Sequence, residues 1–221
     1  MTAKQPDPAF SAASAASVWQ AGWLAGARRC PSPNIGARPA GVAINLVVIH
    51  SISLPPGQYG GDEVQRLFTN TLDWDAHPWF SQIRSLQVSA HFYIRRTGEL
   101  WQFAPVQARA WHAGASSYEG RPNCNDYSIG IELEGLEGGL FEDAQYATLA
   151  ALCRALATAC PIRAVAGHEH IAPSTTPAAA LTGRACAAPC KIFIGVSHAL
   201  MRRRNRSGPH QGAGRVSTAD E

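Results

Sequence analysis

The hydrophobic and polar positions of the chain follow two periods, one typical of strands and the other typical of helices. A continuous apolar run at residues 43–49 predicts a buried strand, and an alternating pattern predicts another strand at 126–134. Apolar segments at 88–95 and 100–103 flank a polar turn at 96–99, which is typical of a β-hairpin. The predicted strands therefore lie between residues 43 and 134.

Two segments have the spacing of amphipathic helices. Residues 62–70 place their apolar side chains on one face. A longer segment begins near Glu142 and Asp143, whose negative charges favour a helix N-terminus. Strands mixed with helices predict an α/β or α+β domain built on one sheet. The stripe of the longer helix consists of Tyr146, Leu149, Ala150, Cys153, Leu156, Ala157 and Cys160.

The two ends of the chain differ in composition from its centre. Residues 1–18 are small, polar and proline-containing, so we expect a disordered N-terminal extension. Residues 19–173 carry the periodic segments and form the predicted domain. After Pro173 the alanines, threonines, arginines and cysteines have no convincing period, so we expect 174–221 to be an atypical, poorly ordered tail.

Composition and charge limit the kinds of partner. Hydrophobic residues make up 46% of the chain, enough for a sizeable core, and the formal net charge of +3 is too small to predict a nucleic-acid partner. We interpret the arginine-rich run at 202–206 as a solvated tail. No stretch approaches the roughly 18–20 apolar residues of a membrane span, so we expect no membrane partner. We expect a monomer.

Two features indicate a cytoplasmic protein. Residues 1–17 have no basic segment followed by a continuous apolar block, so they make a poor export signal. The six cysteines are scattered without the spacing of a disulfide framework, and the Cys186/Cys190 pair lacks the second pair that a metal knuckle needs. We therefore expect free thiols.

Two distant histidines are candidates for a zinc site. His50 closes the apolar run that ends at Ile49, and His168 follows Gly167 far downstream. A hydrolytic zinc takes three protein ligands and keeps a fourth position for water. Spacing alone leaves each histidine open as a ligand or as a hydrogen-bonded residue, and His170 is a rival of His168. The third ligand should be a carboxylate soon after His168, and the chain lacks one at that place.

Glu132 is the candidate general base. Glu132 and Glu134 lie on the same face of the predicted strand, with Leu133 opposite. A carboxylate buried without a partner is costly, so its presence among isoleucines and leucines favours a functional role, in which it takes a proton from zinc-bound water. A salt bridge to a neighbouring arginine is the alternative. We expect Glu134, which is nearer the strand end, to be exposed.

Other residues near these segments have weaker signals. We favour hydrogen-bonded roles that shape the cleft for His91 and His112 over metal ligation. Trp111, beside a glycine-containing loop, either forms an apolar wall for a sugar or peptide or packs in the core. Trp111 and His112 are our candidate substrate-binding residues, and we interpret Cys124 as structural.

Taken together, these segments resemble the AmpD family of cytoplasmic zinc amidases, which belongs to the broader type-2 amidase and peptidoglycan-recognition fold. They occur in the family's order and at its spacing. Two specific motifs are Trp-His-Ala-Gly at 111–114 and Asn-Asp-Tyr-Ser-Ile-Gly-Ile-Glu at 125–132. The matching segments are residues 22–29, 31–34, 46–57, 88–91, 110–114, 124–135 and 167–173.

The resemblance implies an α/β fold in which a central mixed β-sheet is flanked by helices. It also implies that His50 and His168 bind Zn²⁺ and that Glu132 is the catalytic glutamate. The implied substrate is a muropeptide recovered from the cell wall, 1,6-anhydro-N-acetylmuramyl peptide. The implied reaction is hydrolysis of the amide between the lactyl group of the muramyl sugar and L-alanine.

The chain departs from the family after residue 173. The family carries a lysine and, two residues later, the aspartate ligand, in a Lys-x-Asp-Pro-Gly pattern. Without gaps, these positions fall on Thr176 and Ala178, and neither side chain can replace them. We therefore predict weak zinc binding and low activity. The alternatives are a muropeptide-binding protein without catalysis and, less favoured, an arginine-rich tail that binds RNA or acidic lipid.

We hypothesise that a shifted reading frame causes this departure. Codons can be chosen for residues 174–183 with which another frame encodes Asp-Pro-Gly and then Asp-Trp, as the family pattern requires. A shift would also account for the aperiodic sequence after Pro173 and for its arginine-rich end. We expect resequencing of the gene to reveal an insertion or deletion near this point, and an unbroken frame would contradict the hypothesis.

Overall fold

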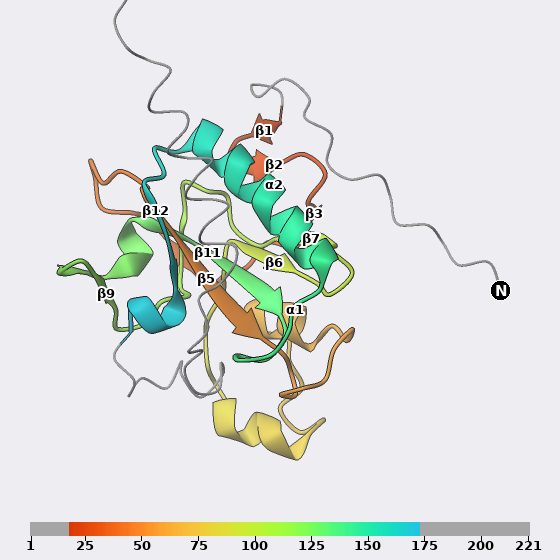
Figure 1. The fold of residues 1–221 in the computed structure, drawn as a ribbon. Coiled ribbons are helices and arrows are strands. Elements are labelled where there is room, and N and C mark those ends of the chain that lie inside the picture. The colour runs from red at the N-terminus through yellow and green to blue at the C-terminus, as the bar shows by residue number, and fades with distance from the viewer. Residues whose placement is uncertain (1–17, 173–221) are drawn as a thin grey trace, which may run out of the picture.

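The computed structural model describes residues 18–172, which form one mixed β-sheet with helices (Figure 1). The central strands run parallel to one another, and β7 is antiparallel to β6 but parallel to β3. The α/β class with a central mixed sheet is therefore confirmed. The strands of the sheet, in spatial order, are β12 (Ala164–Gly167), β5 (Leu46–Ile52), β11 (Ser128–Glu134), β6 (Phe92–Ile94), β7 (Leu100–Gln102) and β3 (Arg28–Arg29).

Small ribbons and short helices surround the sheet. Three antiparallel two-stranded ribbons are β1 (Trp19–Gln20) with β2 (Trp23–Leu24), β4 (Ile35–Gly36) with β8 (Arg109–Ala110), and β9 (Ser117–Tyr118) with β10 (Arg121–Pro122). The 3-10 turns are η1 (Pro78–Ile83), η2 (Cys124–Asp126) and η3 (His168–His170).

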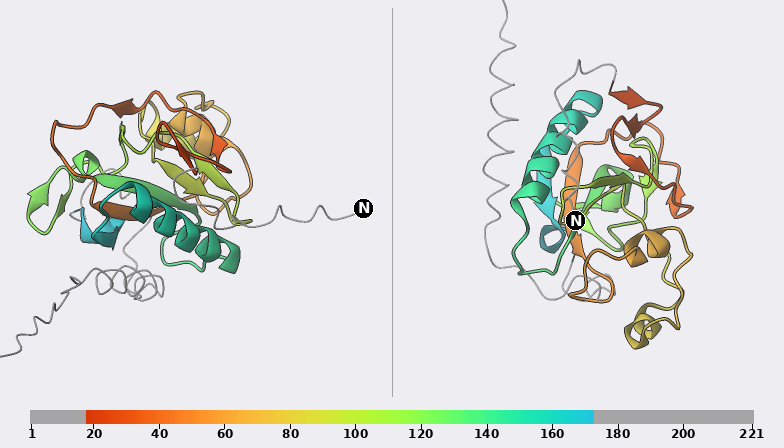
Figure 2. Two further views of the ribbon diagram at one scale, coloured as in Figure 1. Left: turned by 90° about the horizontal axis from the view of Figure 1, so that it is seen from above. Right: turned by 90° about the vertical axis from the view of Figure 1, so that its right-hand side faces the viewer.

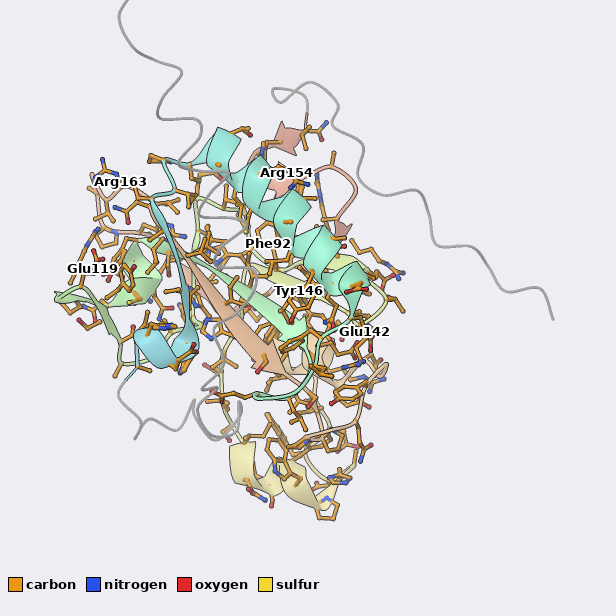
Figure 3. All side chains as sticks on the ribbon, in the orientation of Figure 1. Phe92, Glu119, Glu142, Tyr146, Arg154 and Arg163 are labelled. Atoms are coloured by element: carbon orange, nitrogen blue, oxygen red, sulfur yellow. The ribbon has the colours of Figure 1, made fainter. Side chains whose placement is uncertain are left out.

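Helix α2 (Asp143–Ala159) covers one face of the sheet (Figures 1 and 2). A capping box between Glu142 and Gln145 satisfies backbone groups at its start. The buried amide of Gln145 also donates to the carbonyls of Ile94 and Glu134, which ties the helix to two strands. Phe92 belongs to the core between helix and sheet, which Figure 3 shows behind α2.

The two faces of β11 have different chemistry because side chains alternate along a strand. Ile129, Ile131 and Leu133 pack in the same core as Leu149, Leu152 and Leu156 of α2. The other face carries Ser128, Gly130, Glu132 and Glu134, and all seven residues of the strand are buried. This second face is polar although it lies inside the protein.

Helix α1 (Glu63–Phe68) and η1 lie on the opposite side of the sheet from α2 (Figure 2). Their core includes Phe68 and Phe103, whose rings meet edge to face with centroids 5.0 Å apart. Leu67, Phe80 and Tyr93 belong to the same cluster. The sheet is thus covered on both faces, as mainly parallel sheets require.

The predicted elements are largely present, with shifted bounds. Both helices and the hairpin are confirmed. The strand expected at 88–95 covers only Phe92–Ile94. The strand expected at 43–49 runs instead over Leu46–Ile52, since pairing with β11 continues to Ile52. His50 therefore lies inside a strand rather than just beyond its end.

The expectations for the disordered extension, the tail and its arginine-rich run lie outside the described residues, apart from Val18. This residue packs against the core, and β1 begins directly after it. Cys30, Cys124, Cys153 and Cys160 are free thiols, while Cys186 and Cys190 are outside the described part. Among residues 18–172, no helix has the length and apolar character needed to cross a bilayer.

Candidate functional site

Three adjacent parallel strands bring the predicted catalytic and ligand residues together. In the register of β5 and β11, His50 pairs directly with Glu132. On the other side of β5, Gly167 of β12 pairs with Ile49, and His168 follows at once. The side chains share a pocket towards the carboxyl ends of these strands, where ligands commonly bind in parallel sheets. Phe68, Val88, Ser89, Trp111 and His112 also line the pocket.

The two predicted zinc histidines face each other. Nδ1 of His168 lies 2.9 Å from Nδ1 of His50, and their ring centroids are 5.0 Å apart. Both residues are buried, with exposed fractions of 9% and 4%. His50 and His168 are 118 residues apart in the sequence, and the pairing of β12 with β5 brings their rings together.

The pocket contains polar atoms that lack partners. Nε2 of His168 and Oε2 of Glu132 are buried and make no hydrogen bond within the described part of the chain. Buried polar atoms are normally paired, and exceptions concentrate at functional sites. These two unpartnered atoms therefore mark the pocket as a candidate functional site.

Burial sets the protonation states of the site. Burial, followed by the nearby His168, lowers the pKa of His50 well below its usual range, and burial also lowers the pKa of His168. The imidazoles are thus neutral near pH 7, the form that binds metal ions. Burial raises the pKa of Glu132 to about 8. A pKa near neutrality suits a group that both accepts and returns a proton.

The histidine pair fits part of a zinc site. Two ligand nitrogens at about 2.0–2.1 Å from a tetrahedral zinc lie about 3.3 Å apart, so the 2.9 Å pair needs to open by only a few tenths of an ångström. Imidazole nitrogen is a favoured zinc ligand. Within residues 18–172, however, no group of three histidine, cysteine or carboxylate side chains is arranged to hold a metal.

The neighbours of His168 face away from the pair. Glu169 and His170 are both exposed. Nδ1 of His170 accepts a hydrogen bond from the backbone N–H of Gly167 and lies 3.2 Å from the Glu169 carboxylate. The structure thus places His168, and not His170, among the residues that line the pocket.

The expectation that Glu134 is exposed is wrong. Only 4% of this residue is exposed. Its Oε1 accepts from the N–H of Gly60 at 2.6 Å, and its Oε2 accepts from the N–H of Arg96 at 2.9 Å. Glu134 therefore ties two loops to the end of β11. These two partners are backbone amides, which leave no signature in the sequence.

His91, His112 and Trp111 have distinct surroundings. His91 is fully buried, and its Nδ1 accepts from the N–H of Gly130 at 3.1 Å. Both ring nitrogens of His112 have protein partners, with Nδ1 2.9 Å from Nε2 of His50 and Nε2 3.2 Å from Oγ of Ser128. Trp111 is half-buried on the pocket wall. The hydrogen-bonded interpretation of both histidines thus agrees with the structure.

Sequence reasoning missed two polar residues of this region. Ser128 contacts the His112 ring, and Asn125 accepts hydrogen bonds from the backbone N–H groups of His112 and Ala113. The alternation along β11 was a usable signal for Ser128, because it shares a face with Glu132. Asn125 sits in a turn before the strand and had no such signal.

Comparison with known proteins identifies the family. Residues 40–186 match the model of the family described as N-acetylmuramoyl-L-alanine amidase. The chain belongs to this family. It is 53% identical over 154 residues to the 1,6-anhydro-N-acetylmuramyl-L-alanine amidase AmpD of Escherichia coli (strain K12), covering 69% of this chain and 84% of that protein. AmpD of Haemophilus influenzae is 43% identical over 155 residues, with the same two coverages.

Solved structures of AmpD share the fold. A crystal structure of a selenomethionine AmpD derivative superposes with a TM-score of 0.72 at 48% identity, covering 80% of this chain and 97% of that chain. The solution structure of Citrobacter freundii AmpD gives a TM-score of 0.57 at 47% identity, covering 82% and 96%. The described sheet and helices are thus those of an AmpD-type amidase.

The buried carboxyl of Glu132 predicts a pH-dependent stability. Its folded-state pKa of about 8 lies above the ordinary 4.5, so folding favours the protonated form. The stabilising contribution is fully present below about pH 4.5 and is lost as pH rises towards 8, at about 1.4 kcal/mol per pH unit. We expect Glu132→Gln to make the zinc-free protein more stable at pH 7, by about 3 kcal/mol, with a gain that vanishes near pH 4.5.

Urea unfolding at several pH values measures this difference. Glu119→Gln is the matched control, because Glu119 is exposed on the β9–β10 hairpin at the edge of the molecule (Figure 3). A Glu132→Gln gain that does not change between pH 4.5 and 8 contradicts the burial argument.

Proposed function

We propose that the pocket hydrolyses the amide between the lactyl group of 1,6-anhydro-N-acetylmuramic acid and the L-alanine of muropeptides. The observation that carries the proposal is the convergence of His50, His168 and Glu132 in a buried pocket of an AmpD-type fold. The AmpD relatives are named for this bond. The proposed setting is peptidoglycan recycling in the cytoplasm.

Each side chain has a proposed role. Nδ1 of His50 and Nδ1 of His168 would hold zinc, which supplies a water of lowered pKa and polarises the scissile carbonyl. Glu132 accepts the proton of the attacking water and returns it to the amine of the departing L-alanine. The absence of a hydrogen-bond partner for Glu132 Oε2 within residues 18–172 leaves this oxygen available for that proton.

The pocket wall offers contacts for the substrate. Trp111 presents an indole beside Val88 and Ser89, and we propose that it packs against the apolar side of the sugar or peptide. Both nitrogens of the His112 ring are engaged by His50 and Ser128. Any substrate contact of His112 therefore uses the ring carbons rather than a hydrogen bond.

The sequence after residue 173 limits this chemistry. Thr176 and Ala178 stand where the family pattern has its lysine and its aspartate ligand, and both lie outside the described residues. Losing residues that merely support a ligand costs about 10–100-fold in metal affinity, so losing an anionic ligand itself should cost more. We propose that the chain with this sequence binds zinc weakly and turns over slowly.

Restoring the two residues tests the proposal. We expect the double variant Thr176→Lys/Ala178→Asp to bind zinc more than about 100-fold more tightly than the unaltered chain. The readouts are zinc affinity by chelator competition and release of L-alanyl peptide from anhydromuropeptide. The matched control is Thr175→Lys/Ala179→Asp, which adds the same side chains one position away.

Two results would contradict the proposal. One is stoichiometric zinc with rapid turnover in the unaltered chain, which would show that Thr176 and Ala178 impair neither zinc binding nor catalysis. The other is an absence of product from a zinc-loaded double variant that remains folded.

A second candidate function is muropeptide binding without catalysis. It is favoured by one observation, namely that the described residues contribute two facing histidines but no third metal-binding side chain. Calorimetric titration of anhydromuropeptide into zinc-free protein distinguishes the two functions. Saturable binding without product supports the second candidate, and an absence of binding removes it.

A further inference from the structure

We propose that His112 is a positioning residue that fixes the proton and the orientation of the His50 ring, through a hydrogen-bond chain that ends on Ser128 and the Cys124 carbonyl. The effect of His112 on zinc affinity rests on the proposed function, whereas the hydrogen-bond chain itself does not. The chain runs from His50 to His112 at 2.9 Å, from His112 to Ser128 at 3.2 Å, and from Ser128 to the Cys124 oxygen at 2.6 Å.

The carbonyl at the end of the chain determines the direction of every hydrogen bond. A carbonyl oxygen only accepts, so the Ser128 hydroxyl donates its single hydrogen to Cys124. Oγ of Ser128 then offers only lone pairs to the His112 ring. Nε2 of His112 must therefore carry a hydrogen and donate it to Ser128.

The same reasoning continues to His50. The His112 ring is buried and its two nitrogens contact only His50 and Ser128, with no carboxylate to balance a positive charge, so the ring is neutral and carries one hydrogen only. With that hydrogen on Nε2, Nδ1 of His112 is an acceptor and takes the hydrogen of His50 Nε2. Nδ1 of His50 is left without a hydrogen, and its lone pair faces Nδ1 of His168 at 2.9 Å.

The backbone and ring of His112 are held in place independently of this chain. Oδ1 of Asn125 accepts from the N–H groups of His112 at 3.0 Å and Ala113 at 2.9 Å. A Cβ atom on Gly130 would lie only 2.4–2.7 Å from three atoms of the His112 ring. Only glycine at this position lets the ring lie against β11.

One face of β11 therefore serves the site at three successive inward positions. Ser128 accepts from His112, Gly130 makes room for its ring, and Glu132 presents its carboxyl beside His50. A metal ligand needs an unprotonated nitrogen in a fixed direction, and partners on the opposite ring nitrogen provide both. The hydrogen-bond chain thus keeps Nδ1 of His50 unprotonated and its ring oriented, as a cation requires, before any cation is present.

Nuclear magnetic resonance of the zinc-free protein tests the hydrogen-bond chain directly. With ¹⁵N-labelled histidine, we expect a hydrogen on His50 Nε2, none on its Nδ1, and a coupling across the hydrogen bond to His112 Nδ1. This readout depends on neither zinc nor turnover, so it stands or fails separately from the amidase proposal. A hydrogen on His50 Nδ1, or no coupling, overturns the inference.

Zinc affinity tests the consequence. In the Thr176→Lys/Ala178→Asp background, we expect Ser128→Ala and His112→Phe each to weaken zinc binding about 10–100-fold. His112→Asn keeps an acceptor oxygen close to the place of Nδ1 and should recover part of the loss. Ser53→Ala is the control, since Ser53 is equally buried but outside the chain, bonding instead to the N–H of Gly57.

The zinc affinities of these variants decide whether His112 has a positioning role. Unchanged affinity in Ser53→Ala with losses in Ser128→Ala and His112→Phe supports the positioning role. Equal affinities in all variants that remain folded, as judged by thermal unfolding, overturn it.

Discussion

The parallel pairing of β5 with β11 is the constraint on which the site depends. Its register places His50 opposite Glu132. A slip by one residue would turn every side chain of β11 to the other face. Glu132 would then point into the apolar core beneath α2, and Ile131 or Leu133 would enter the pocket. The packing of β11 against α2 therefore fixes the geometry of the chemistry on its opposite face.

Hydrogen bonds reduce the free-energy cost of burying the polar face of β11. Most of its groups have partners, because Ser128 binds His112 and the Cys124 carbonyl while Glu134 binds the amides of two loops. Glu132 Oε2 is the exception on this face. An unsatisfied buried group costs stability, and such costs concentrate where a protein must bind or react. The unpaired oxygen and the unpaired His168 nitrogen thus mark the reactive part of an otherwise well-bonded region.

The described domain and the sequence beyond it are in disagreement. Residues 18–172 have the sheet and the helices of an AmpD-type amidase, and His50 and His168 face each other within them. Beyond them, we propose that Thr176 and Ala178 stand where the family pattern has a lysine and a metal-binding aspartate. A fold does not by itself confer activity. The residues at these two positions therefore affect the expected activity but not the membership of the family. An aspartate supplies an anionic oxygen ligand, which a methyl group cannot replace.

The sequence by itself determined the class of fold, both helices, the hairpin and the residue types of the site. Periodicity was sufficient for these because burial imposes period 2 on strands and 3.6 on helices. It could not determine the true bounds of β5, because pairing with β11 extends that strand to Ile52. Nor could it determine the burial of Glu134 or the hydrogen-bond chain through His112 and Ser128. Those depend on backbone amides and side chains that only the folded sheet brings within 3 Å or so of each other.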